Sequence, residues 1–120
     1  MRALALDIAT TTGVAFDGPD GRPMCQTFRV DAVDPDDYGS RYVQFSDWLA
    51  GLIAVAAPTL IGFEAPIPPR GNNIATNIRT LRLLGGLAAH AESEAVRAGI
   101  EVIEENVSTI KKHLTGNGHA

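Results

Sequence analysis

The sequence of 120 residues lacks the features that mark secreted and membrane-spanning chains. Its single cysteine, Cys25, excludes an internal disulfide framework and makes a reducing compartment the default expectation. The longest uncharged apolar stretches, 48–63 and 83–91, are too short or too often interrupted by glycine to span a bilayer. The apolar stretch ahead of Asp7 is too short for a signal peptide. We therefore expect a cytoplasmic globular domain with no membrane partner.

Acidic residues are absent from two stretches, although the chain carries a net charge of −4. Segments 65–91 and 106–120 contain no Asp or Glu, while the acids concentrate in 31–37 and 92–105. An uneven distribution of this kind predicts a basic face that can meet phosphate groups despite the overall negative charge. The same stretches are equally consistent with ordinary solvated surface.

The first half of the chain predicts an antiparallel meander followed by a helix. Apolar strands are expected over 3–8, 14–16 and 24–30, with turns at 10–13 and 18–21. Apolar residues spaced three and four apart then predict a helix over 38–57, which Pro58 ends: Tyr42, Phe45, Leu49, Leu52, Ile53 and Ala56.

The second half predicts two crossovers back to the same sheet. A buried strand is expected over 59–63, a proline-rich loop over 65–73, a long helix over 74–98, a fifth strand over 100–103 and a short helix over 107–114. Gly99 suits the end of the long helix. The order βββαβαβα predicts an α/β domain with a mixed five-stranded sheet flanked by helices, the order of the ribonuclease H-like fold.

Two carboxylates occupy corresponding places in this arrangement. Asp7 is the one charge within the first apolar strand, and Glu64 directly follows the fourth. In the expected sheet these two strands run parallel and adjacent, about 4.8 Å apart, so their carboxyl ends meet. Facing carboxylates repel each other, and a hard divalent cation such as Mg²⁺ or Mn²⁺ relieves that repulsion. A single strand-end acid is otherwise often only a turn anchor.

Four segments carry a resemblance to a known family: LALDIATTTGVA (4–15), IGFEAPIPP (61–69), LRLLGGLAAHA (81–91) and NVSTIKKHLTGNG (106–118). In this order and spacing they resemble the RuvC-type Holliday junction resolvases of bacteria and phages. The resemblance implies a homodimeric, structure-selective endonuclease that nicks branched DNA by two-metal phosphodiester hydrolysis. It also implies Mg²⁺ as cofactor, with Mn²⁺ as a substitute, and the cytoplasm of a bacterial or phage-infected cell.

By this resemblance, Asp7 and Glu64 match the metal carboxylates of the family's first and fourth strands. Lys111 matches the basic residue ahead of the family's glycine-bracketed loop. Ile67 stands three positions after Glu64, where the family has an aromatic residue that wedges into the junction. An apolar side chain can still part a base step there, without the stacking contribution.

Other candidate DNA contacts come from the acid-free stretches and from the threonine-rich segment after the first strand. They are Lys112, Arg70, Arg79, Arg82 and Thr11. Surface solubility explains any one of the arginines equally well, and a threonine-rich turn is more often only a turn.

The resemblance further implies carboxylates on a helix beyond the Gly116–Gly118 loop, whereas this sequence has no acid after Glu105. We therefore expect 1–120 to be a single ribonuclease H-like nuclease domain without its C-terminal helix. We also expect the natural chain to continue past Ala120, since 1–120 alone would lack part of the cleavage site.

Two other functions fit parts of the sequence. One is a non-catalytic scaffold that binds branched DNA and dimerises, which would keep the basic stretches and lose the metal. The other is a fragment of an actin-like sugar kinase or ATPase, because 7–15 is similar to the first phosphate loop of those proteins. Their loop favours glycine where this chain has Ala9, and they need two such domains to enclose a nucleotide.

Overall fold

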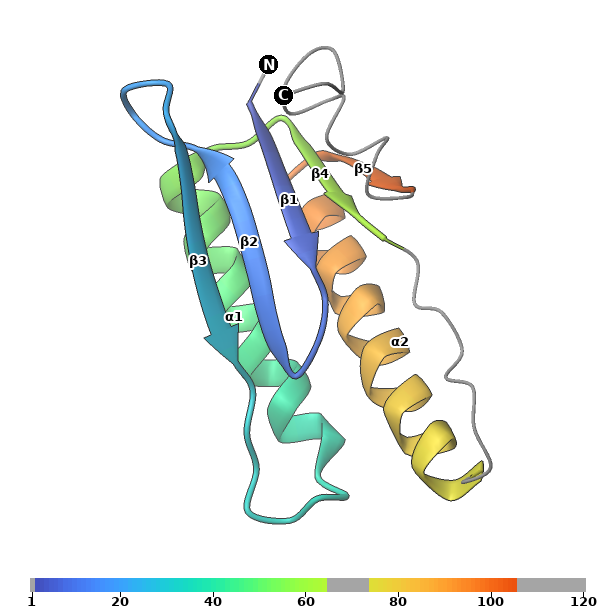
Figure 1. Cartoon of the computed structure of the whole chain (residues 1–120). Helices are drawn as coiled ribbons and strands as arrows, with labels where there is room; N and C mark the ends of the chain where they lie inside the picture. Colours follow the sequence, from blue (N-terminus) through green and yellow to red (C-terminus); the bar gives the residue numbers. More distant parts are fainter. Residues whose placement is uncertain (1, 65–73, 106–120) are drawn as a thin grey trace.

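The computed structural model describes residues 2–64 and 74–105, and it contains the expected five-stranded mixed sheet. The strands are β1 (Ala3–Asp7), β2 (Thr11–Asp17), β3 (Pro23–Arg29), β4 (Leu60–Phe63) and β5 (Glu101–Glu104), in the spatial order β3-β2-β1-β4-β5 (Figure 1). β1 pairs antiparallel with β2, β2 with β3 likewise, and β1–β4 and β4–β5 are parallel. The α/β class and the mixed sheet are confirmed.

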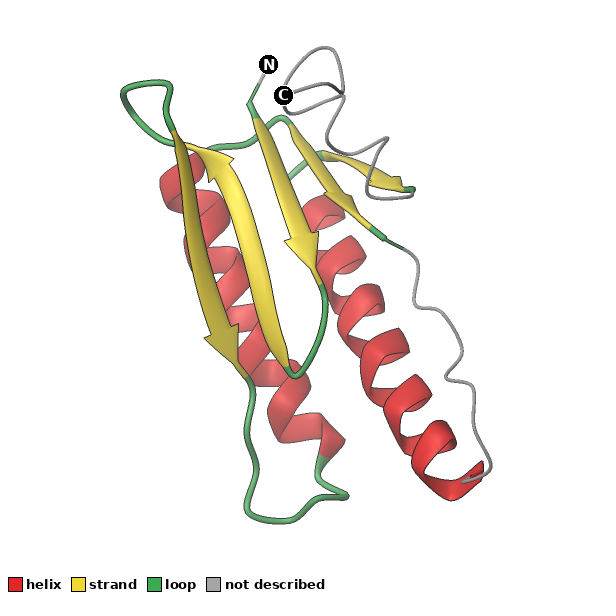
Figure 2. Cartoon of the chain, viewed as in Figure 1, coloured by secondary structure: helices red, strands yellow, loops and turns green. Residues whose placement is uncertain are grey.

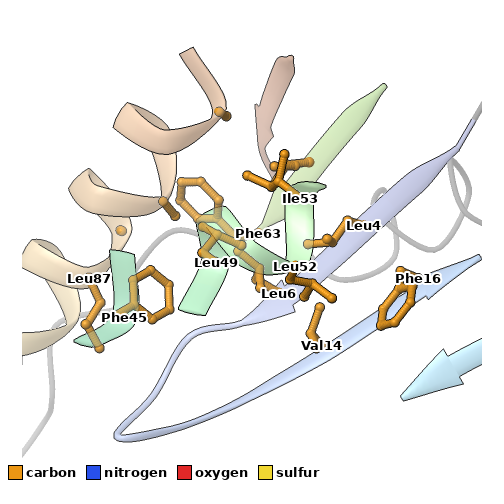
Figure 3. Packing of buried hydrophobic residues seen from close by; sticks show 14 of the residues in the cluster. Leu4, Leu6, Val14, Phe16, Phe45, Leu49, Leu52, Ile53, Phe63 and Leu87 are labelled. Carbon is orange, nitrogen blue, oxygen red and sulfur yellow. The ribbon is translucent and has the colours of Figure 1, made fainter. Parts of the chain in front are cut away.

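Two helices of the described residues, α1 (Tyr38–Ala56) and α2 (Ile74–Arg97), cover one and the same face of this sheet (Figure 2). Alternate strand residues such as Leu4, Leu6 and Phe63 point toward the helices and meet Phe45, Leu49 and Leu87 in the core (Figure 3). The expected short helix over 107–114 lies outside the described residues. No helix in the described part of the chain is both long and apolar enough to cross a lipid bilayer.

The expected turn at 10–13 is wrong, because β2 already begins at Thr11. The chain reverses over Ile8–Thr10 instead. The side chain of Thr12, the second residue of β2, is fully buried. Its Oγ1 donates to the Ala9 carbonyl at 2.9 Å and accepts from the Ala9 amide at 3.3 Å. These two hydrogen bonds satisfy the buried hydroxyl and make the reversal tight. Thr11 and Thr12 are β-branched residues that favour strands, and both belong to β2.

Local capping fixes where the helices begin and end. Asp37 caps α1, accepting from the backbone N–H of Ser40 at 3.0 Å and from its hydroxyl at 2.6 Å. These two bonds lower the pKa of the Asp37 carboxyl. At the end of α2, Gly99 has φ +71°, its N–H donates to Val96, and the N–H of Ile100 donates to Ala95. This is a Schellman motif, as expected for glycine at that position.

Gly86 of α2 packs directly against the Tyr42 ring of α1. A Cβ on Gly86 would collide with the tip of the Tyr42 side chain, whereas a Cβ on Gly85 would meet nothing within 4 Å. The Tyr42 hydroxyl donates to the Arg82 carbonyl at 2.8 Å, which holds the ring in place. Its ring also stacks on His90, with centroids 5.0 Å apart. The adjacent glycines therefore have different structural roles.

We expect opposite effects from alanine at these two glycines. Gly85→Ala should stabilise the protein by up to ~1 kcal/mol, because alanine favours the helix and the site is open. Gly86→Ala should destabilise it by about 1–3 kcal/mol, since Tyr42 must move and lose its hydrogen bond. Urea denaturation of both variants measures this. Equal free energies of unfolding for the two variants would contradict the assigned helix packing.

Candidate active site

The candidate site lies where β1 and β4 end side by side. The parallel register pairs Leu6 with Phe63, and one further step along both strands brings Asp7 beside Glu64. Both residues are exposed. Adjacent strands lie about 4.8 Å apart, so the two carboxylates are close neighbours at one edge of the sheet.

Asp7 points away from the helices. Side chains alternate along a strand, and Leu4 and Leu6 are in the core, so Asp7 lies on the opposite face. No helix among residues 2–64 and 74–105 covers that face (Figure 2). Its neighbour in β2 is Gly13, where an added Cβ would lie 3.8 Å from the Cβ of Asp7. The glycine therefore leaves space on the β2 side of Asp7.

This donor set fits a hard divalent cation. Mg²⁺ prefers oxygen ligands, keeps several waters, and is commonly held by one or two carboxylates together with substrate phosphates. Within the described residues, no group of three or more His, Cys, Asp and Glu side chains is arranged to hold a metal. Asp7 and Glu64 can thus supply two ligands from an open surface, and the remaining positions fall to water and substrate.

Sequence reasoning missed a third acid at the same edge. The N–H of Glu105 donates to the Phe63 carbonyl at 3.0 Å, which continues the β4–β5 pairing by one residue. Val102 packs toward the core, so alternation places Glu105 on the open face with Glu64. No comparable signal marks Glu105 in the sequence, because β5 begins and ends in glutamate and Glu104 directly precedes Glu105.

The predicted basic and polar contacts are dispersed. Arg79 is exposed and forms an ion pair with Asp36 at 3.5 Å. The Arg82 guanidinium lies over the Tyr38 ring, 4.2 Å from its centroid. Thr11 begins β2, at the same end of the sheet as Asp7, and accepts a long hydrogen bond of 3.5 Å from Arg29. The remaining candidates lie outside the described residues: Ile67, Arg70, Lys111 and Lys112.

Comparison with solved structures gives three similar proteins. RuvC of Thermus thermophilus matches with a TM-score of 0.62 and 18% identity, over 100% of this chain and 72% of that one. T. thermophilus RuvC in complex with a Holliday junction substrate matches with a TM-score of 0.66 and 14% identity, over 98% and 80%. The yeast mitochondrial Holliday junction resolvase Ydc2 matches with a TM-score of 0.53 and 11% identity, over 93% and 52%.

No protein-family model and no curated protein sequence matches the chain. At these identities the structural matches define the fold. The chain has the ribonuclease H-like fold found in RuvC-like resolvases, as its sequence segments indicated.

A disulfide between positions 7 and 64 tests the adjacency of the two carboxylates. In a Cys25→Ser background, we expect Asp7→Cys with Glu64→Cys to crosslink under mild oxidation. Facing positions on two neighbouring strands lie within the Cα separation of roughly 4.4–6.8 Å that a disulfide needs. The matched control is Thr11→Cys with Glu64→Cys, two strands apart in the sheet order, which should stay reduced. Mass spectrometry of peptides distinguishes the pairs, and efficient crosslinking of the control alone would contradict the register.

Proposed function

We propose that this protein is a structure-selective DNA endonuclease that nicks Holliday junctions or related branched DNA, with Asp7 and Glu64 as its metal-binding carboxylates. The observation that carries the proposal is the parallel β1–β4 pairing, which brings both acids to the open face of a RuvC-like fold. One of the similar structures holds a Holliday junction substrate, which supports branched DNA as the ligand.

Two Mg²⁺ ions at such a site would prepare the attacking water and stabilise the leaving 3′ oxygen, and Mn²⁺ would substitute. The contribution of the chain is to hold Asp7 and Glu64 on adjacent strands of a rigid sheet. Their backbones are fixed by ladder hydrogen bonds and by a core that includes Leu6 and Phe63. Because the two carboxylates lie on an open face and not in an enclosed pocket, a DNA strand can reach them.

The DNA contacts, the oligomeric state and the domain organisation belong to the same proposal. We propose that the protein acts as a homodimer and that Ile67 parts the bases. The proposed DNA contacts are Lys111, Lys112, Arg70, Arg79, Arg82 and Thr11. We also propose that 1–120 is one nuclease domain and that further carboxylates complete its metal site. Figure 1 supports the single domain, because all five strands belong to one sheet over one core.

The test is Mg²⁺- and Mn²⁺-dependent nicking of a labelled four-way junction by the full-length gene product. We expect Asp7→Asn and Glu64→Gln each to lower the nicking rate by at least ~100-fold, because each removes a charged ligand at the reacting phosphate. Junction affinity without metal should change little. Asp20→Asn and Glu92→Gln, exposed acids away from the site, are matched controls that should nick at the wild-type rate.

Three other results would contradict this proposal in different ways. Tight junction binding with no nicking by wild type would favour a non-catalytic branched-DNA scaffold. Nicking that survives both Asp7→Asn and Glu64→Gln would place the active site elsewhere. Neither binding nor nicking would remove nucleic acid as the partner, and ATP affinity would then test the kinase-like alternative.

A further inference from the structure

β3 is an edge strand of the sheet, and only one of its two sides is paired. It stands first in the order β3-β2-β1-β4-β5, and its seven residues pair with β2 without a bulge. Within residues 2–64 and 74–105, no strand pairs with its outer side (Figure 1). The amide and carbonyl groups on that side can therefore form a hydrogen-bonded ladder with a further strand.

The other edge strand, β5, is protected against such pairing, whereas β3 is not. β5 has only four residues, begins and ends in glutamate, and is followed by Glu105. Short length and charge are two of the devices that keep edge strands from pairing with other chains. In β3, proline and charge occur only at the first and last residues, Pro23 and Arg29. The five residues between them are uncharged, so β3 is the edge that can accept a strand.

A groove lies between β3 and α1, on the helix side of the sheet. Met24 and Gln26 of β3 face this side, because they pair with the core residues Phe16 and Val14. The opposite wall is on α1 and consists of Asp47, Trp48, Gly51, Leu52 and Val55. The groove has a volume of about 560 Å³, within the range of roughly 300–1,000 Å³ that ligand pockets occupy.

The groove follows the flank of α1 that is turned away from α2. Tyr42 of α1 reaches α2, where its hydroxyl donates to the Arg82 carbonyl. Trp48 lies on another flank, and its ring stacks on Phe28 of β3 with centroids 4.9 Å apart. The groove beside Trp48 therefore opens along the outer side of β3. Gly51 deepens it, because a Cβ added there would meet nothing within 4 Å.

An extended peptide paired with β3 would direct every second side chain toward this groove. Side chains alternate along a strand, and successive ones on the same face are about 7 Å apart. The walls of the groove offer apolar surface that is exposed to water, since Val55 is 83% exposed and Met24 is 41% exposed. A bulky apolar side chain of the peptide would cover this surface and remove it from water.

The charges at the groove select a basic residue at the next position on the same face. Asp47 is exposed, forms no ion pair within residues 2–64 and 74–105, and lies one helical turn before Gly51. The other acid of the lining, Asp17, alternates onto the open face of the sheet. The Arg2 guanidinium is engaged, because its Nε and Nη2 donate to backbone carbonyls at 2.9 and 3.1 Å. A lysine or arginine of the peptide can therefore pair with Asp47.

We propose that β3 and this groove bind an extended segment of a partner protein, which adds a strand to the sheet and carries a bulky apolar residue and a basic residue two positions apart. In this mode of recognition the backbone hydrogen bonds supply affinity, and the alternate side chains supply specificity. The apolar residue packs over Gly51 against Met24, and the basic residue pairs with Asp47. The groove lies on the opposite face of the sheet from Asp7 and Glu64, so the partner leaves the candidate active site uncovered.

The first test uses the fluorescence of Trp48, the single tryptophan of the chain, which lines the groove. The probe is the acetylated and amidated peptide TVTLTKT, whose leucine and lysine share one face of a strand. We expect it to shift the Trp48 emission to shorter wavelength, with saturation in the micromolar to millimolar range. The peptide TVTLTET should bind wild type at least ~3-fold more weakly. This difference should vanish in Asp47→Asn and persist in the control Glu92→Gln.

The second test blocks the groove and the strand pairing separately. Gly51→Leu fills the groove with a side chain and should weaken TVTLTKT binding at least ~5-fold. Gly85→Leu, the same change at an exposed and open glycine of α2, is the matched control and should bind as wild type. N-methylation of alternate residues of TVTLTKT gives two peptides, each blocked along one edge. One should lose binding and the other should keep it, because only one edge of the peptide faces β3.

Unchanged Trp48 emission, wild-type affinity in Gly51→Leu, or binding of both N-methylated peptides would overturn the inference. A change of Trp48 emission with protein concentration alone would assign the edge to a second copy of the chain, and would overturn it as well. Thermal denaturation of each variant establishes that lost binding does not come from unfolding. None of these measurements uses DNA or metal, so their failure leaves the nuclease proposal intact, and a failure to nick junctions leaves the peptide site intact.

Discussion

The parallel pairing of β1 with β4 is the constraint on which the rest of the structure depends. Strands that pair parallel need a long connection between them, and here β2, β3 and α1 form it. The same pairing puts the carboxyl ends of both strands at one edge, so that Asp7 and Glu64 become neighbours although they are 57 positions apart in the sequence. The core on the helix side, with Leu6 and Phe63 side by side, fixes this register, because a slip of β4 by one residue would turn Phe63 to the open face.

Opposite charges are kept apart at that edge. The carboxylates lie on the open face of the sheet, whereas Arg41 and Arg79 belong to the first halves of α1 and α2 on its other face. Had the arginines met the carboxylates directly, each set would have neutralised the other. Their separation leaves the acids on the open face available for a cation.

Much of this arrangement could be predicted from sequence, for identifiable reasons. The apolar runs that end in Asp7 and Glu64 marked two strands, and the element order implied that they lie together, which the parallel register confirms. The start of β2 at Thr11 was missed because the buried hydroxyl of Thr12 finds its partner only in the folded reversal. Glu105 was also missed, since only the β4–β5 pairing brings it beside Glu64.

The most direct measurement of the central claim is a double-mutant cycle on Mn²⁺ affinity by isothermal titration calorimetry. If Asp7 and Glu64 share one ion, Asp7→Asn and Glu64→Gln should each weaken Mn²⁺ binding by at least ~10-fold. The double variant should then lose clearly less than the product of the two single losses. Losses that multiply, or single variants that bind Mn²⁺ as wild type does, would contradict a shared cation between β1 and β4.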